Sequence, residues 1–258
     1  MSFDTILYAL ADDVATITLN RPDKMNAMNA VMRQELAQAL AQAASEARAV
    51  VLTGSGNGFC AGQDLGDVNS FDELDLGATL RDEYEPIIKQ IYDFPVPVIC
   101  AVNGAAAGAG ANLALAADIV IAAHSASFLE AFARIGLIPD AGGTYWLPRL
   151  VGRARAMGMC LLADKIPAGK ALEWGLIWDV VEDDQLQDHA AKMAQRLAKG
   201  PTMAYRLIKS ALRESDGNDF EAQLSVEATL QAEAGQSRDF REGVMAFLEK
   251  RPAVYEGR

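Results

Sequence analysis

The sequence predicts an α/β protein with a helical region at its C-terminus, on three observations. Short β-branched and aliphatic runs alternate with longer amphipathic runs through the first part of the chain. Glycine-rich segments directly follow several apolar runs, as ligand-binding loops follow the strands of α/β proteins. After about residue 185 the strand-like runs stop and only helical patterns remain. We therefore expect a core of strand and helix units over residues 1–185 and a helical region over 186–258 used in assembly.

The first elements are predicted to be a β-hairpin, a helix and a buried strand. Residues 6–10 and 14–19 are β-rich runs separated by Ala-Asp-Asp, which predicts two antiparallel strands. From about residue 29 to 45, alanine and leucine recur at helical spacing among polar residues. Residues 49–53 predict a buried strand, and we expect the glycine-rich run 54–65 to be a loop.

The same alternation continues through the middle of the chain. The acidic stretch 66–77 predicts a mobile loop, and 79–92 a helix that ends before two prolines. Residues 97–102 and 118–123 predict buried strands, and the apolar run 110–117 between them predicts a short helix buried on all sides. Other expected elements are a helix or turn at 128–135, helices at 142–150, 154–162 and 168–174, a strand at 177–181, and helices at about 186–198, 202–214, 220–233 and 239–250.

Composition excludes several classes of function. The formal net charge of −12 opposes binding to nucleic acid or to an anionic membrane surface. No apolar run reaches membrane-spanning length and the first residues do not resemble a secretory signal, so we expect a cytoplasmic protein. Cys60, Cys100 and Cys160 are widely spaced and have no close Cys or His partner, so neither a disulfide framework nor a metal site is expected.

Two small-residue segments, 58–65 and 104–112, each follow a predicted buried strand. If those strands are neighbours, the segments face each other and the backbone N–H groups of Ala61 and Ala109 converge on one carbonyl oxygen. Such a pair stabilises a developing oxyanion by roughly 3 kcal/mol per donor. The alternative is that these glycines only form tight turns.

Asp140 lies in a turn bounded by glycine and proline, Gly136-Leu-Ile-Pro-Asp-Ala-Gly-Gly-Thr. A side chain in such a turn can project into a cleft. One carboxylate beside an oxyanion site indicates proton-transfer chemistry. The alternative is an ordinary turn residue with no chemical role.

Seven elements carry a resemblance that covers nearly the whole chain: Leu19-Asn-Arg-Pro, Asn26-Ala-Met, Phe59-Cys-Ala-Gly-Gln-Asp-Leu, Val102-Asn-Gly-Ala-Ala-Ala-Gly-Ala-Gly, Ala117-Asp-Ile, Phe128 and the Gly136 segment. In this order they resemble the enoyl-CoA hydratase/isomerase (crotonase) superfamily. Within it the chain is most similar to the 1,2-epoxyphenylacetyl-CoA isomerases of aerobic phenylacetate degradation. This narrower placement is supported by the Phe59 segment, Pro97-Val-Ile-Cys-Ala-Val-Asn-Gly, Arg153-Ala-Arg-Ala-Met-Gly and Arg241-Glu-Gly-Val-Met-Ala-Phe-Leu.

The resemblance implies a spiral of repeated ββα units whose C-terminal helices form a trimerisation region and cover the active site. It implies a homotrimer or a dimer of trimers that binds an acyl-CoA, with no cofactor, since coenzyme A is part of the substrate. It assigns the oxyanion N–H groups to Ala61 and Ala109 and places the adenine near residues 24–27. The implied substrate contacts are Lys24, Met25, Ala27, Ala61, Gln63, Asp64, Leu65, Gly108, Phe132 and Tyr145. For Lys24 a solvated surface position, and for Asp64 a capping role, are the alternatives.

The departures from the family pattern bear on the reaction. Hydratases of the superfamily carry two glutamates that activate water, and Asn112 and Phe132 stand at those positions here. Neither can act as a general base, although Asn112 can position the substrate by hydrogen bonding. Asp140 stands where several isomerases of the superfamily place an acidic base. Glu130 precedes the second glutamate position by two residues, and on a helix it would point elsewhere, so we expect it at the surface.

The resemblance and these departures predict an acyl-CoA isomerase that converts ring-1,2-epoxyphenylacetyl-CoA to oxepin-CoA, with 3-enoyl-CoA to 2-enoyl-CoA isomerisation as a second activity. Asp140 shuttles the proton, and other enzymes of the phenylacetate pathway are candidate partners. A generic enoyl-CoA hydratase or 3,2-enoyl-CoA isomerase of fatty-acid oxidation is one alternative. A non-catalytic acyl-CoA-binding or scaffold subunit is the other.

Overall fold

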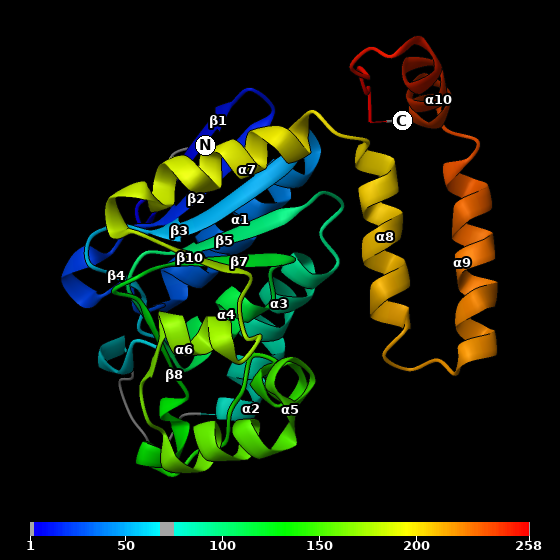
Figure 1. The fold of residues 1–258 in the computed structure, drawn as a ribbon. Coiled ribbons are helices and arrows are strands. Elements are labelled where there is room, and N and C mark those ends of the chain that lie inside the picture. Colours follow the sequence, from blue (N-terminus) through cyan, green and yellow to red (C-terminus); the bar gives the residue numbers. More distant parts are fainter. Residues whose placement is uncertain (1–2, 68–74, 258) are drawn as a thin grey trace.

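A six-stranded sheet forms the centre of the molecule in the computed structural model, which describes residues 3–67 and 75–257 (Figure 1). The two N-terminal strands pair antiparallel, as the predicted hairpin requires, and the other neighbours pair parallel. Every residue of the third and fourth strands is buried, because helices cover both faces. In spatial order the strands are β1 (Ile6–Ala11), β2 (Val14–Leu19), β3 (Ala49–Gly54), β5 (Val98–Val102), β7 (Ile119–Ala123) and β10 (Asp179–Val181).

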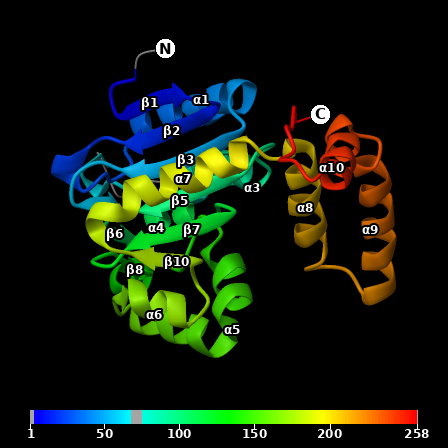
Figure 2. The ribbon, with the colours of Figure 1, turned by 45° about the horizontal axis from the view of Figure 1, so that its top comes forward.

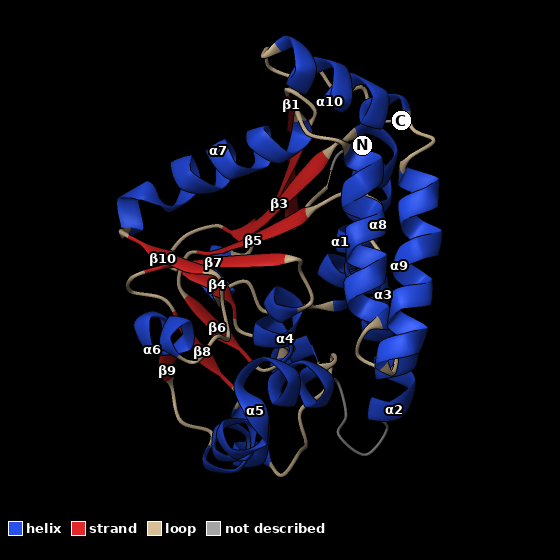
Figure 3. Ribbon diagram, turned by 45° about the vertical axis from the view of Figure 1, so that its right-hand side comes forward, coloured by secondary structure: helices blue, strands red, loops and turns tan. Residues whose placement is uncertain are grey.

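A second sheet of four short strands runs in a different direction from the first (Figure 3). Three of its strands each follow a strand of the central sheet after a few residues, which produces the repeated ββα units expected from the family resemblance. The sequence prediction missed all four strands, and it treated the first two as parts of loops. They are β4 (Gly58–Cys60), β6 (Ala105–Ala107), β8 (Ser127–Leu129) and β9 (Ile166–Pro167).

Helices cover both faces of the central sheet (Figure 2). On one face lies α1 (Ala30–Glu46), whose N-terminus is capped by the Asn29 side chain, together with α3 (Glu85–Tyr92). On the other lies α7 (Leu186–Ala198), which buries Leu186, Ala190, Ala194 and Ala198. The helical region predicted to begin at residue 186 therefore starts with a helix that packs on the core. The division of the chain after residue 185 into a core and a helical region stays a prediction.

The helices near the second sheet follow the predicted spans closely. All seven residues of α4 (Ala109–Leu115) are buried, as its apolar sequence predicts. The helix α5 (Gly143–Leu162) is interrupted at Gly152, whose φ of 76° separates the two helices predicted there. A 3₁₀ turn (Ala131–Ile135) follows β8, and α6 (Ala168–Glu173) follows β9.

A π-helical turn (Leu80–Tyr84) joins α2 (Leu76–Thr79) to α3, so this segment is helical from residue 76 to 92. Most of the predicted mobile loop, residues 68–74, lies outside the described residues. In the described part of the chain, no helix combines the length and apolar character needed to cross a membrane.

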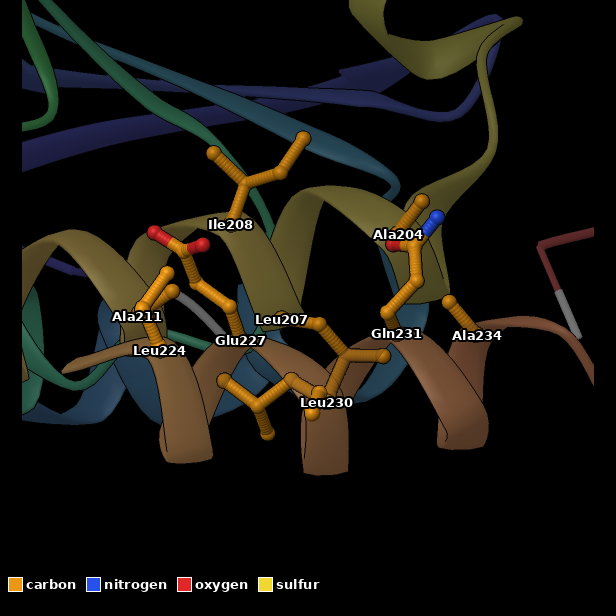
Figure 4. Close-up of a pocket in the computed structure, with 10 residues that line it drawn as sticks. Ala204, Leu207, Ile208, Ala211, Leu224, Glu227, Leu230, Gln231 and Ala234 are labelled. Carbon is orange, nitrogen blue, oxygen red and sulfur yellow. The ribbon is translucent and has the colours of Figure 1, made fainter. Parts of the chain in front are cut away.

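Three helices extend away from the core at the C-terminus: α8 (Thr202–Glu214), α9 (Phe220–Ala234) and α10 (Arg238–Glu249) (Figures 1 and 3). Lys209 of α8 holds the first of them to the core, since its ammonium donates to the carbonyls of Phe94 and Val96 and pairs with Asp118 at 2.6 Å. Leu207 of α8 points toward Leu230 of α9, and both line an apolar groove between the two helices (Figure 4).

Candidate active site

The two predicted oxyanion segments lie against each other. Strands β4 and β6 pair in parallel, with Cys60 opposite Ala106, so the chain leaves both strands at the same edge. Gly62 has a φ of +90°, and a Cβ there would lie 2.8 Å from the Ala107 carbonyl oxygen and 3.4 Å from the Ala109 nitrogen. Only glycine fits at this position without moving one segment away from the other.

The two candidate donors differ in their present hydrogen bonding. Ala109 is the first residue of α4, so its N–H has no acceptor within the helix and lies at the positive end of the helix dipole. The Ala61 N–H donates to the Met25 carbonyl oxygen at 3.0 Å. A thioester oxygen that binds here must share this N–H with Met25 or displace that carbonyl.

The segment predicted to lie near the adenine runs alongside the first oxyanion segment. Met28 N donates to the Gly62 carbonyl at 2.7 Å, and Asp64 N donates to the Met28 carbonyl at 3.1 Å. Met25, Ala27, Ala61, Gln63 and Leu65 are thereby brought together, with Met25 and Leu65 exposed. Lys24 is exposed close by. Gly108, the N-cap of α4, lies across from them, beyond Gly62.

Arg21 holds this region together, a role that its place in the sequence does not indicate. Its guanidinium donates to the Ala27 carbonyl and pairs with Asp64 at 2.8 Å. The hydrogen bond from Arg21 lowers the pKa of Asp64. The Asp64 carboxylate also accepts from the Gly66 N–H, so in this structure it fastens the loop.

Asp140 lies in the wall of a cavity of about 720 Å³. Much of the lining is apolar or aromatic, and an ion pair between Glu85 and Lys89 also borders it. Burial raises the pKa of Asp140 to about 6. Its Oδ1 atom is buried and has no hydrogen-bond partner among the described residues. The apolar and aromatic side chains that line it belong to Leu76, Leu80, Tyr84, Ile88, Leu137, Ile138, Pro139, Ala141 and Tyr145.

Tyr84 contacts both the Asp140 cavity and the first oxyanion segment, although neither Ala61 nor Ala109 is among the residues that line the cavity. This side chain is buried, lines the cavity, and donates its hydroxyl proton to Gln63 Oε1 at 2.9 Å. Phe132 lies against the second segment, since its ring carbon Cζ would be 3.6 Å from a Cβ built on Gly108. An aromatic ring thus packs against the N-terminus of α4.

A tight turn with unusual backbone angles presents Asp140. Ala141 and Gly142 have φ values of +47° and +87°, as in a type I′ turn. The left-handed region is unfavourable for alanine, so surrounding contacts must hold this turn. The Asp140 carbonyl accepts from Gly143 N at 2.8 Å and from Asn112 Nδ2 at 2.9 Å, and Trp146 Nε1 donates to the Ala141 carbonyl at 3.4 Å.

Glu130 corrects the sequence prediction, which placed it at the surface. Its side chain is 1% exposed, and Oε2 accepts from Asn112 Nδ2 at 3.3 Å. Burial and the nearby Asp140 raise the pKa of Glu130 to about 7. The prediction failed because the helical angle of 100° per residue was applied to a chain that is extended at β8. In a strand, residues i and i+2 share a face, so the buried Phe128 is the signal that places Glu130 inside.

The Asp140 cavity therefore combines a largely apolar lining with a carboxyl group of raised pKa, and Asn112 in the first turn of the buried helix α4 donates to the Asp140 carbonyl. This combination suits proton transfer at a carbon atom beside a polarised carbonyl. In residues 3–67 and 75–257, no cluster of His, Cys, Asp and Glu is arranged to hold a metal ion.

Comparison with known proteins identifies the family. The family model for enoyl-CoA hydratase/isomerase matches residues 10–258. A "probable enoyl-CoA hydratase" of Rhodobacter capsulatus is 58% identical over the full length of both chains. The 1,2-epoxyphenylacetyl-CoA isomerase of Escherichia coli is 49% identical over 98% of each chain.

A solved structure shares the fold. The crystal structure of an enoyl-CoA hydratase from Bacillus anthracis superposes with a TM-score of 0.91 at 34% identity, covering 99% of this chain and 100% of that one. The ββα units and the C-terminal helices described above match this architecture. The chain is therefore an enzyme of the enoyl-CoA hydratase/isomerase (crotonase) superfamily, whose typical substrates are acyl-CoA thioesters.

Proposed function

We propose that this enzyme is an acyl-CoA isomerase in which Asp140 carries the proton. The observation that supports this most strongly is the position of Asp140, a carboxyl group of raised pKa in the wall of an apolar cavity. Asn112 and Phe132 stand where the hydratases of the superfamily carry glutamates, so no glutamate at those two positions can act as a general base beside Asp140.

The proposed reaction needs one base and one site for negative charge. Ionised Asp140 removes a proton from the carbon beside the thioester carbonyl, and the electron pair of the broken C–H bond moves onto the thioester oxygen. The N–H groups of Ala61 and Ala109 stabilise this enolate oxygen. Asp140 then returns the proton to another carbon of the conjugated system, so a 3-enoyl-CoA becomes a 2-enoyl-CoA with no atom gained or lost.

We propose ring-1,2-epoxyphenylacetyl-CoA as the natural substrate, with oxepin-CoA as the product. This reaction is also an isomerisation, so it consumes neither water nor a redox equivalent. Two observations support the choice: Tyr84 and Tyr145 add aromatic surface to the cavity, and the relative at 49% identity carries this activity in its name.

Hydration of an enoyl-CoA is the second candidate, because the relative at 58% identity is described as a hydratase. Hydration requires a group that activates water. Asn112 cannot supply one, and Phe132 places a hydrocarbon ring at the other position. We therefore rank hydration below isomerisation.

Parallel assays of the wild type and Asp140→Asn test the proposal. The wild type is expected to isomerise the epoxide and a 3-enoyl-CoA, and to hydrate crotonyl-CoA poorly. Asp140→Asn keeps the volume of the side chain and is expected to lose at least about 100-fold in kcat, as removal of a general base does. Full activity of the variant, or brisk crotonyl-CoA hydration with no isomerisation by the wild type, would contradict the proposal.

A further inference from the structure

Glu130 is a buried acid without an obvious structural reason for its burial. Its side chain is 1% exposed, and among the described residues its carboxyl group makes one hydrogen bond, from Asn112 Nδ2. At 3.3 Å this bond is longer than the usual 2.7–3.2 Å. A carboxyl group with so little hydrogen bonding is costly to bury, whether it is neutral or ionised.

The partner of Glu130 is the residue that holds the Asp140 turn. Asn112 Nδ2 has two hydrogens, and the structure directs them to Glu130 Oε2 and to the Asp140 carbonyl. Asn112 is fully buried, and its Oδ1 has no partner within the described part of the chain. The Glu130 oxygen Oε2 accepts from Asn112 Nδ2, and a carboxyl group keeps an accepting oxygen whether it is neutral or ionised, so this contact orients the amide with Nδ2 toward Glu130. The other hydrogen of the amide then points to Asp140.

This contact matters because the Asp140 turn is strained at Ala141, with its φ of +47°. A strained turn keeps its shape only while its contacts hold it. We propose that Glu130 is a positioning residue that, through Asn112, keeps the Asp140 turn in the shape that presents the carboxylate to the cavity. This inference rests on the proposed role of Asp140 as the base.

Few other titratable groups face Glu130 in the described structure. Asp140 lies close enough to add to the effect of burial on the pKa of Glu130, and Cys160 of α5 has a pKa that is raised by burial and, to a smaller extent, by Glu130. Neither pairs with the carboxyl group of Glu130. The effect of Glu130 on Asp140 therefore passes through the Asn112 amide and through space, and substitutions can separate these two routes.

Glu130→Leu and Glu130→Gln form a matched pair that tests the inference. Leucine removes the acceptor for Asn112, whereas glutamine has nearly the volume of glutamate and keeps an oxygen that can accept. For 3-enoyl-CoA isomerisation, Glu130→Leu is expected to lower kcat about 10-fold to 100-fold, as misplacement of a catalytic group by about 1 Å does. KM is expected to change less than about threefold, and Glu130→Gln to keep kcat within about threefold.

A double-mutant cycle with Asn112→Ala separates positioning from a structural role. If Glu130 acts through Asn112, Glu130→Leu lowers kcat by no more than about twofold once Asn112 is absent. Thermal unfolding of each variant shows whether stability falls along with kcat. A wild-type kcat in Glu130→Leu, or an undiminished effect in the Asn112→Ala background, would overturn the inference. If the leucine variant does not fold, Glu130→Met is judged by the same criteria.

A crystal structure of Glu130→Leu separates failure of this inference from failure of the proposed function. Even if the wild type isomerises no substrate, the inference expects the hydrogen bond from Asn112 Nδ2 to the Asp140 carbonyl to be lost in this variant. An unchanged hydrogen bond and an unchanged Asp140 turn would overturn the inference whatever the enzyme catalyses.

Discussion

A carboxyl group acts as a base only when it is ionised, and burial raises the pKa of Asp140 to about 6. Below that pH the group already carries a proton and cannot remove one from a substrate. Isomerisation, measured as kcat/KM, is therefore expected to rise about tenfold per pH unit below 6 and to level off above it. A profile that is flat between pH 5 and 7 would exclude Asp140 as the base.

Glu130 is expected to make stability fall as pH rises. Its pKa is about 7 in the folded chain, against an ordinary value of 4.5, so between these values the unfolded chain ionises while the folded chain stays protonated. This difference favours unfolding by an amount on the order of 3 kcal/mol, which is fully reached above pH 7.

Glu130→Gln removes this contribution. Relative to the wild type, the variant is expected to gain stability when the pH is raised from 4.5 to 8, as measured by denaturant unfolding at both values. An identical pH dependence of the two proteins would show that Glu130 has an ordinary pKa in the folded chain.

Among elements, those that the sequence predicts well differ physically from those it misses. The hairpin, α1 and the four C-terminal helices are long enough to display a period, and each appears within a few residues of its predicted span. The strands β4, β6, β8 and β9 have two or three residues, too few for an alternation to be visible, and β4 and β6 lie in glycine-rich or alanine-rich segments.

The residues of the candidate site likewise fall into those that local sequence predicts and those that it does not. Sequence motifs locate the Asp140 turn and the two oxyanion segments, because positive φ angles and close backbone contacts there require glycine at particular positions. The positions of Arg21 and Glu130 depend on tertiary contacts with Asp64 and Asn112, which lie 43 and 18 residues away in the chain. The i, i+2 relation to Phe128 indicates that Glu130 is buried, but no local pattern encodes its contact with Asn112 or that of Arg21 with Asp64.

The junction between β4 and α4 is expected to depend on Gly62. Alanine there would combine an unfavourable φ of +90° with a Cβ only 2.8 Å from the Ala107 carbonyl, so the segments that carry Ala61 and Ala109 must move apart. Gly62→Ala is therefore expected to lower kcat/KM about 100-fold, as loss of an oxyanion donor does.

Gly175→Ala is the matched control for Gly62→Ala. Its φ is +78°, but the nearest atom to a Cβ there is the Leu150 carbonyl oxygen, at an ordinary 3.6 Å. Gly175→Ala is expected to lower the free energy of unfolding by about 1 kcal/mol and to keep kcat/KM within about threefold of the wild-type value. Equal kinetic effects of the two substitutions would show that the separation of the oxyanion segments does not matter.

For the molecule as a whole, the C-terminal helices expose more apolar surface than a lone chain needs. Phe220, Phe247 and Leu248 are 73%, 82% and 68% exposed, and the groove between α8 and α9 is lined largely by alanine and leucine. Large exposed apolar patches are typical of interfaces. We propose that these faces are covered in the homotrimer, or dimer of trimers, that the family resemblance implies.

Phe247→Glu is expected to weaken this assembly, because a carboxylate cannot be buried there without a partner. Light scattering should give three times the chain mass of 27.6 kDa, or six times, for the wild type and a smaller value for the variant. Leu7→Glu, an exposed position on β1, is the control and should leave the mass unchanged. A wild-type mass of one chain would contradict the proposed trimer.

Exchange of the substrate proton with solvent tests the central role of Asp140 most directly. In D₂O, the wild type is expected to introduce deuterium beside the thioester carbonyl of an acyl-CoA, as measured by mass spectrometry, because Asp140 removes that proton and returns one from solvent. Asp140→Asn should exchange at least about 100-fold more slowly while it still binds the acyl-CoA. Equal exchange rates in the two proteins would contradict the assignment of Asp140 as the base.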